Sequence, residues 1–236
     1  MALLFTHVHK TAGASFAQSV IYPNVDQERI HHFCGVWNLL KNRGQVMDYV
    51  SGHYPYGIHM FMKGDGPNIY FTILREPLDR AVSYYYYVKQ LDTPLFKHQS
   101  LPDANRFDIA GFYGLENYQN IQTKFIAGLF IMRTAAFLPK VLGDSLLLSH
   151  AKHNLCKRYR AFGLFERINE FQETAAKIMG WKNLNVKNET TVTRKRPSVH
   201  QLAEEAKVSI LRANRLDVDL YRFAQGLYHQ RLEKSL

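Results

Sequence analysis

Short apolar runs alternate with helix-favouring segments along the chain, and this alternation constrains the fold more than any other feature. Strands are expected at residues 3–8, 30–33, 48–54, 68–76 and 160–166. Helices are expected from about residue 15 and at residues 36–43, 77–91, 116–128, 134–156, 168–180 and 199–232. Strands that alternate with helices form a parallel sheet covered on both faces. The sequence therefore predicts an α/β fold of three layers around a central, mainly parallel sheet.

Two segments lack this pattern. Residues 92–114 are rich in Pro, Asp, Asn, Gly and Phe, and we expect an irregular excursion over the surface there. Residues 182–198 are polar and basic, and predict a loop. Neither has the composition of an inter-domain linker, so we expect residues 1–236 to form a single domain, a size that one core can support.

The charge balance favours anionic ligands. The chain has 30 Lys and Arg against 20 Asp and Glu, a formal net charge of +10. Nucleic acid, an anionic polysaccharide and a phosphorylated cofactor all fit such a charge. The most apolar stretch, residues 125–148, is interrupted by Arg133, Lys140 and Asp144, so we expect no membrane span. No signal peptide precedes the first apolar run, and we expect a cytoplasmic protein.

The first predicted strand runs into the turn "FTHVHKTAGASF" at residues 5–16. It is not a Walker motif, because its lysine precedes the small residues. Parallel sheets bind ligands where strands end and the next helices begin. There Gly13 would let backbone N–H groups approach an anion, Lys10 would add a charge, and Thr11 and Ser15 would add hydroxyl donors. The alternative is a plain strand–turn–helix with a solvated lysine.

The segment "TILREPLDRAVSYYYY" predicts a second part of the same site. Arg75 lies at the end of the fourth predicted strand, and Ser83 lies two turns into the next helix. An arginine at a strand end can bind phosphate through two hydrogen bonds, and a serine can add another. Taken alone, Arg75 could instead form a surface salt bridge and Ser83 could pack against backbone.

Together these two stretches resemble a known family. "HVHKTAGASF" is similar to the 5′-phosphosulfate-binding motif of sulfotransferases that use 3′-phosphoadenosine 5′-phosphosulfate (PAPS), and "ILREPLDRAVSYYY" is similar to their 3′-phosphate-binding motif. The motif sequences are most similar to those of the carbohydrate sulfotransferases of the heparan sulfate 2-O and 6-O type. "ENYQNIQTKFIAG" at residues 116–128 also resembles their Asn/Gln-Thr helix. The resemblance extends from about residue 5 to about residue 225.

The resemblance implies a P-loop-like fold and transfer of the sulfuryl group of PAPS, without a metal, to an acceptor hydroxyl. The usual acceptors in this family are carbohydrates. It implies that Arg75 and Ser83 hold the 3′-phosphate. The 5′-phosphosulfate would be cradled by Lys10, Thr11, Ala12, Gly13, Ala14 and Ser15. Ala12 and Ala14 replace a glycine and a threonine of the family pattern, and the second change removes one hydroxyl donor. Lys10 would also stabilise charge on the leaving nucleotide.

The attacking hydroxyl must lose a proton, and a neutral imidazole suits that task. Among eleven histidines, His53 is the leading candidate, because it follows a predicted strand and Gly52 and because "SGHY" resembles the Gly-His segment of the 2-O-sulfotransferases. His59 and His9 are the next candidates. His7 and His9 share a strand face, but no third ligand at useful spacing supports a metal site.

Three further interpretations stay open. The basic run at 193–198 is either solvated or folds over the nucleotide, where Arg194, Lys195 and Arg196 would contact the 3′-phosphate or an anionic acceptor. A small-molecule kinase could use the same turn, but would need a metal-binding carboxylate at a strand end, and the strand that ends in Arg75 offers only Glu76. A non-catalytic polyanion-binding module would fit the charge, but not the ordered Lys, Arg, Ser and His positions. We expect no nucleic-acid partner.

Overall fold

The computed structural model describes residues 2–33, 36–42, 44–62, 67–91, 93, 97–185 and 196–233. Its five strands are β1 (Ala2–Thr6), β2 (Ile30–Phe33), β3 (Tyr49–Gly52), β4 (Asn68–Leu74) and β5 (Tyr159–Leu164). They form one sheet in the order β2-β3-β1-β4-β5, and every neighbouring pair is parallel. The predicted parallel sheet is confirmed, with each strand within two residues of its expected bounds.

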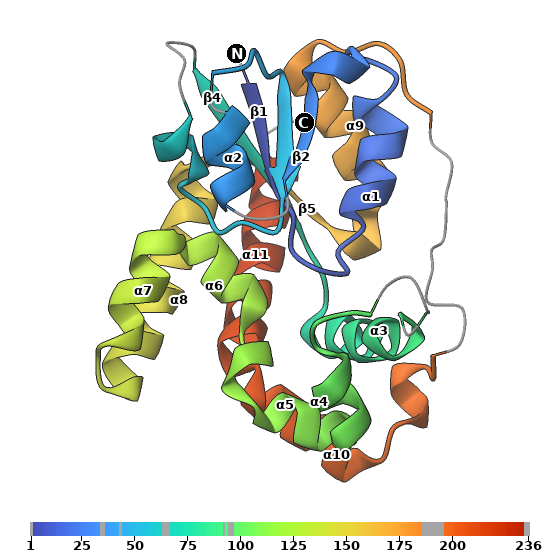
Figure 1. The fold of residues 1–236 in the computed structure, drawn as a ribbon, viewed down its shortest axis with the longest axis vertical. Coiled ribbons are helices and arrows are strands. Elements are labelled where there is room, and N and C mark those ends of the chain that lie inside the picture. The colour runs from blue at the N-terminus through green and yellow to red at the C-terminus, as the bar shows by residue number, and fades with distance from the viewer. Residues whose placement is uncertain are drawn as a thin grey trace.

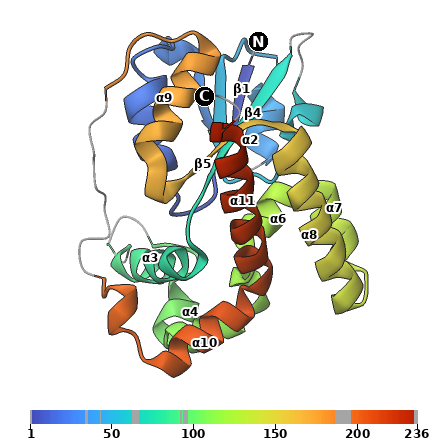
Figure 2. The same cartoon turned by 180° about the vertical axis from the view of Figure 1, so that it is seen from behind.

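Helices cover both faces of the sheet (Figures 1 and 2). Side chains alternate along each strand, so Leu3 and Phe5 of β1 enter one core while Leu4 enters the other. On the first face lie α1 (Gly13–Phe16), the π-helix η1 (Ala17–Ile21) and α9 (Ile168–Met179). On the second lie α2 (Val36–Asn42), α6 (Ile121–Ala127), α7 (Leu129–Ala136), α8 (Lys140–Lys157) and α11 (Arg215–Glu233).

A third apolar cluster lies beyond the end of the sheet at which the strands finish (Figure 1). Its helices are α3 (Pro77–Gln90), α4 (Leu101–Arg106), α5 (Ile109–Gly114) and α10 (Glu204–Ala213). The register aligns Thr6 with Gly52 and Thr72, so β1 and β3 end at one level while β4 runs on to Leu74. The turns after β1, β3 and β4 therefore meet between the sheet and this helical cluster.

The expectation of an irregular excursion at residues 92–114 was wrong. Residues with a turn-like composition begin helices there: Pro102 lies in the first turn of α4, and the side chain of Asp108 accepts a hydrogen bond from Gly111 N at the start of α5. The aromatic residues of this segment, Phe112 and Tyr113, are fully buried. They belong to the third core rather than to an exposed loop.

Three expected helices are interrupted. Residues 116–128 hold a 3-10 turn (Glu116–Tyr118) and α6, and residues 134–156 divide between α7 and α8 on either side of Pro139. The prediction of a single helix at residues 199–232 was also wrong, because this segment divides into a 3-10 turn (Val199–Gln201), α10 and α11. At the last break, the Asn214 side chain donates to Ile210 O and accepts from Asn120 N. A side chain that competes for backbone groups in this way ends a helix.

Among the described residues, no helix is both long and apolar enough to cross a membrane.

Candidate active site at the carboxyl edge of the sheet

The turn between β1 and α1 is held in an unusual backbone conformation. Lys10 and Ala12 have positive φ angles of 66° and 65°. The left-handed region costs an L-residue with a Cβ about 1–2 kcal/mol, and such strain is concentrated at functional sites. The Thr11 hydroxyl donates to Val8 O at 2.9 Å and is buried, so it closes the turn internally. Ala12 therefore holds a left-handed conformation in which glycine would be unstrained.

Glycine at position 13 was predicted to let backbone N–H groups approach an anion. The structure adds a packing reason. A Cβ at this position would collide with the imidazole of His7. The N-cap residue of α1, Ala12, has no side chain that can cap the helix, and the first turn has no acidic residue. Because α1 runs directly into η1, helical backbone extends from residue 13 to residue 21. The positive end of this segment thus faces the turn without a competing carboxylate.

Lys10 forms no ion pair with any residue that the structure describes. Its Nζ lies 4.1 Å from the centre of the Tyr87 ring, in a cation–π contact with α3. Burial, with Arg75 and then Arg196 nearby, lowers the pKa of Lys10 to about 8. The side chain is therefore a partly desolvated cation with no neutralising partner in that part of the chain.

Three histidines from two strand ends gather beside this turn. The rings of His9 and His53 stack with centres 3.7 Å apart and an interplanar angle of 11°, and His7 lies 4.7 Å from His53. Burial, then the neighbouring histidines, lowers the pKa of His7 to about 3 and that of His9 to about 2. All three rings are consequently neutral near pH 7.

The tautomer of His53 follows from its hydrogen bond. Its Nδ1 lies 2.8 Å from the carbonyl oxygen of His7, and a carbonyl can only accept, so Nδ1 carries the proton. Nε2 then keeps its lone pair. Burial against the other rings lowers the pKa of His53, the His7 hydrogen bond opposes that shift, and His98 adds to it. Although packed in this way, His53 stays exposed at the surface, so its Nε2 can act as a general base.

Arg75 is buried and already paired. Its Nε and Nη2 donate to Asp79 Oδ2 at 2.8 and 2.5 Å, its Nη1 donates to Lys10 O at 2.9 Å, and the guanidinium lies on the Phe165 ring. The contact with Lys10 O holds the β1–α1 turn to the end of β4. The residue is thus brought to the predicted site, but most of its donors are engaged by the protein.

Asp79 binds a second guanidinium, that of Arg196, whose Nη1 lies 2.5 Å from Oδ1. Burial alone would raise the pKa of Asp79, but the hydrogen bonds and charges of the two arginines lower it. Ser83 follows Asp79 one helical turn later on the same face of α3, and it is 3% exposed. Arg196 and Arg75 thus meet at Asp79, one helical turn before the buried Ser83. Arg194 and Lys195 lie outside the described residues.

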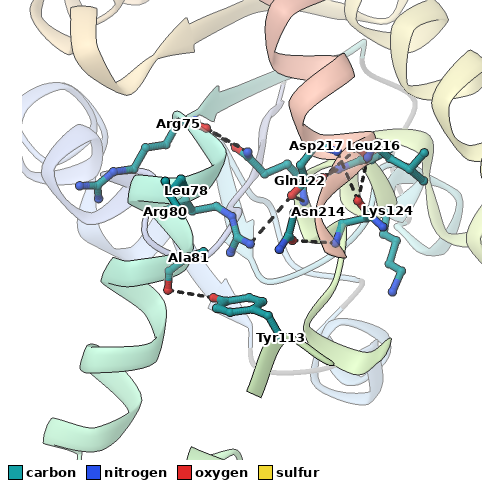
Figure 3. Close-up of polar contacts among 12 residues, drawn as sticks. Arg75, Leu78, Arg80, Ala81, Tyr113, Gln122, Lys124, Asn214, Leu216 and Asp217 are labelled. Atoms are coloured by element: carbon teal, nitrogen blue, oxygen red, sulfur yellow. Dashed lines mark hydrogen bonds and ion pairs between the residues drawn. The ribbon is translucent and has the colours of Figure 1, made fainter. Parts of the chain in front are cut away.

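A polar network fixes the end of β4, and sequence reasoning missed its roles (Figure 3). The Gln122 side chain accepts from Arg75 N and donates to Arg75 O, each at 2.9 Å. Asp217, which is fully buried, accepts from Gln122 N and Thr123 N at the start of α6. The polar string "NYQNIQT" was a visible signal, but only the tertiary structure shows that it holds Arg75.

A pocket of about 440 Å³ opens beside the histidines. It is lined by His9, Arg80, Tyr84, Gln99, Ser100, Asp103, Asn117, Tyr118 and Ile121. Arg80 is 1% exposed, its Nη2 lies 3.9 Å from Asp217 Oδ2, and its Nε and Nη2 have no hydrogen-bond partner in the described part of the chain. The mixture of two tyrosines with amide, hydroxyl and charged groups suits a polar organic ligand.

His59 does not join the cluster. Its Nδ1 lies 2.8 Å from the Tyr70 hydroxyl, and it lines a separate pocket of about 700 Å³ between Tyr56, α7 and α8. The strand-end carboxylate of Glu76 is also engaged elsewhere, since it accepts from Leu78 N and Asp79 N as the cap of α3. Within the described ranges, no group of three or more His, Cys, Asp or Glu side chains is arranged to hold a metal ion.

Comparison of the chain with protein-family models gives no match. Comparison with curated proteins gives none either.

Proposed function

We propose that the protein is a PAPS-dependent sulfotransferase with a P-loop-like β1–α1 turn, acting in the cytoplasm on a hydroxyl of a carbohydrate acceptor. When bound, PAPS supplies a sulfuryl group that a hydroxyl can accept by in-line displacement. The observation that carries the proposal is the position of His53: an exposed, neutral imidazole with its lone pair on Nε2, whose ring stacks on His9, the residue that precedes Lys10 in the β1–α1 turn.

The donor side rests on residues 10–15. Backbone N–H groups at the start of α1 and the Lys10 ammonium would bind the 5′-phosphosulfate, because both present positive charge without a carboxylate partner. The Thr11 hydroxyl acts within the turn rather than toward a ligand. Lys10 also suits the leaving nucleotide, since negative charge on the bridging oxygen grows during transfer and a nearby cation stabilises it most in the transition state.

The 3′-phosphate would lie against Arg75, Ser83 and Arg196. Each guanidinium has N–H groups beyond those that bind Asp79, and the two arginines place two charges at one point on α3. Asp79 competes with the phosphate for both of them. The fit is therefore weaker here than at the β1–α1 turn.

The acceptor side rests on the pocket that His9 lines. Because the His9 ring stacks on His53, a sugar held against Tyr84 and Tyr118 would carry its hydroxyl to the neighbourhood of His53 Nε2. His53 would take the hydroxyl proton as the oxygen attacks. The bond from Nδ1–H to His7 O holds the ring orientation and stabilises the imidazolium that forms.

Calorimetry in the presence of a chelator tests the donor assignment. We expect 3′-phosphoadenosine 5′-phosphate (PAP) to bind in a saturable manner without metal, and we expect transfer of radiolabelled sulfate from PAPS to members of a carbohydrate panel. A kinase would instead bind ATP with Mg²⁺ and would leave PAP unbound. A polyanion-binding module would bind heparin and nucleic acid alike, with a strong dependence on salt.

A further inference from the structure

The turn that joins α7 to α8 carries an unusual set of exposed apolar side chains. Phe137 is 90% exposed, Val141 77%, Leu142 56% and Leu138 39%. We call these four residues the hairpin tip. The two helices project away from the sheet, and the turn that joins them lies at their far end (Figures 1 and 2). Four large apolar residues within six positions form a patch, which soluble surfaces rarely leave uncovered.

The tip is also basic. The two cations around the apex, Arg133 and Lys140, are both exposed, whereas the nearest acid in the sequence, Asp144, is paired with Arg215. Among the described residues, Lys140 pairs with Glu116 at 3.5 Å, and because both side chains are exposed, this pair is worth little in water. The whole chain has a net charge of +10. An anionic partner is therefore favoured both at the tip and at longer range.

The backbone of the tip can leave water at little cost. Phe137 N donates to Thr134 O, Leu138 N to Ala135 O and Gly143 N to Pro139 O, and Pro139 itself has no N–H. No side chain caps the N-terminus of α8 and no acid lies in its first turn, so its remaining N–H groups suit the phosphate of a lipid headgroup.

We propose that the hairpin tip inserts into the headgroup region of an anionic phospholipid membrane. A convex end with apolar side chains at its apex and cations behind them matches an interfacial anchor, in which the apolar groups enter the acyl boundary and Lys140 and Arg133 reach the phosphates. A protein partner would need a complementary groove around the same apex. The anchor is independent of the sulfotransferase assignment.

Vesicle co-sedimentation tests the proposal with the full chain. The probes are phosphatidylcholine vesicles and matched vesicles in which one quarter of the lipid is phosphatidylglycerol. The tip variant is F137S/V141S, and the matched control is V46S/V208S, which removes apolar side chains that are 67% and 56% exposed elsewhere on the surface. Circular dichroism checks that each variant is folded.

We expect the wild type and the control to bind the anionic vesicles equally. The tip variant should bind at least about tenfold more weakly. K140Q should lower binding to anionic vesicles roughly fivefold and leave the weaker binding to neutral vesicles unchanged. Equal binding by tip variant and control would overturn the proposal, because it would show adsorption through net charge alone. The proposal would also be overturned if the wild type did not bind vesicles but formed a concentration-dependent dimer in sedimentation velocity. If F137S/V141S abolished that dimer, the tip would be assigned to contact with a second copy of the chain.

Discussion

The β1–α1 turn and the β4–α3 junction lie at the same edge of the sheet, and both present cations, yet their electrostatic states differ. The Lys10 ammonium lies over the Tyr87 ring and forms no ion pair with a described residue. No acid lies in the first turn of α1. Arg75 and Arg196 at the junction share the carboxylate of Asp79. The cation of the turn is not neutralised by any described carboxylate, whereas the two cations of the junction are partly neutralised by Asp79.

This difference teaches that a cation at a strand end is not by itself an anion-binding site. A ligand phosphate gains the full interaction with Lys10, but at Arg75 it gains only the excess over the pair with Asp79. Arg75 also has a structural role, because its Nη1 holds the carbonyl of Lys10. The two regions are therefore coupled, and variants can separate what each contributes.

The largest effect is expected at His53, whose ring stacks on His9 of the β1–α1 turn. His53→Ala should lower turnover by about 10²–10⁴-fold and leave the PAP affinity nearly unchanged, because a general base acts on the acceptor and not on the nucleotide. Steady-state kinetics with PAP calorimetry measure both. His59→Ala is the matched control, since His59 lies in the separate pocket. Loss of PAP binding in the His53 variant would assign His53 to nucleotide binding instead.

The second effect compares the two regions directly. Lys10→Ala should weaken PAP binding and lower turnover together, since in the proposed function Lys10 would bind both the 5′-phosphosulfate and the leaving group. Arg75→Ala should cost about 2–4 kcal/mol of PAP binding, and much less for adenosine 5′-phosphosulfate, which lacks the 3′-phosphate. Calorimetry with the two nucleotides measures the difference. An equal loss for both would mean that Arg75 acts only by holding the turn through Lys10 O.

The pH dependence should show two groups of the candidate site, His53 after β3 and Lys10 in the β1–α1 turn. The pKa of His53 is lowered, so the base stays neutral at pH 7 and the rate falls only when pH drops below the ordinary histidine range near 6.5. Lys10, with a pKa of about 8, loses its charge as pH rises past 8, and the rate should fall again. In Lys10→Arg the alkaline limb should disappear from kcat/KM, because arginine stays charged. A persistent alkaline limb would place that ionisation elsewhere.

The smallest effect is expected at Asp79. Asp79→Asn removes the carboxylate that competes with the 3′-phosphate while keeping a side chain that can still accept from the arginines. We expect PAP to bind a few-fold more tightly, about 1 kcal/mol or less, since the charges are partly solvated. Adenosine 5′-phosphosulfate serves as the control and should change little. Weaker PAP binding would mean that Asp79 is needed to orient Arg75 and Arg196.

Much of the fold follows from local pattern. The five strands and the helices at 36–42, 77–90 and 168–179 match their expected ranges within two residues, because apolar periodicity reports directly on burial. The errors lie where tertiary contacts decide. Phe112 and Tyr113 fill a third core that the composition of residues 92–114 concealed, and Asn214 interrupts a continuous helical pattern by binding Asn120 and Ile210.

The sequence by itself determined which residue types stand at the ends of β1, β3 and β4, and a parallel sheet requires those ends to share one edge. Only the tertiary structure decided their states. In the folded chain His9 stacks on His53, and the hydrogen bond to His7 O keeps the proton of His53 on Nδ1. Lys10 lies over the Tyr87 ring, and Arg75 is paired with Asp79. The physical reason is that charge, tautomer and solvation depend on neighbours brought together from distant segments, whereas strand and helix periodicity depends on residues close in the chain.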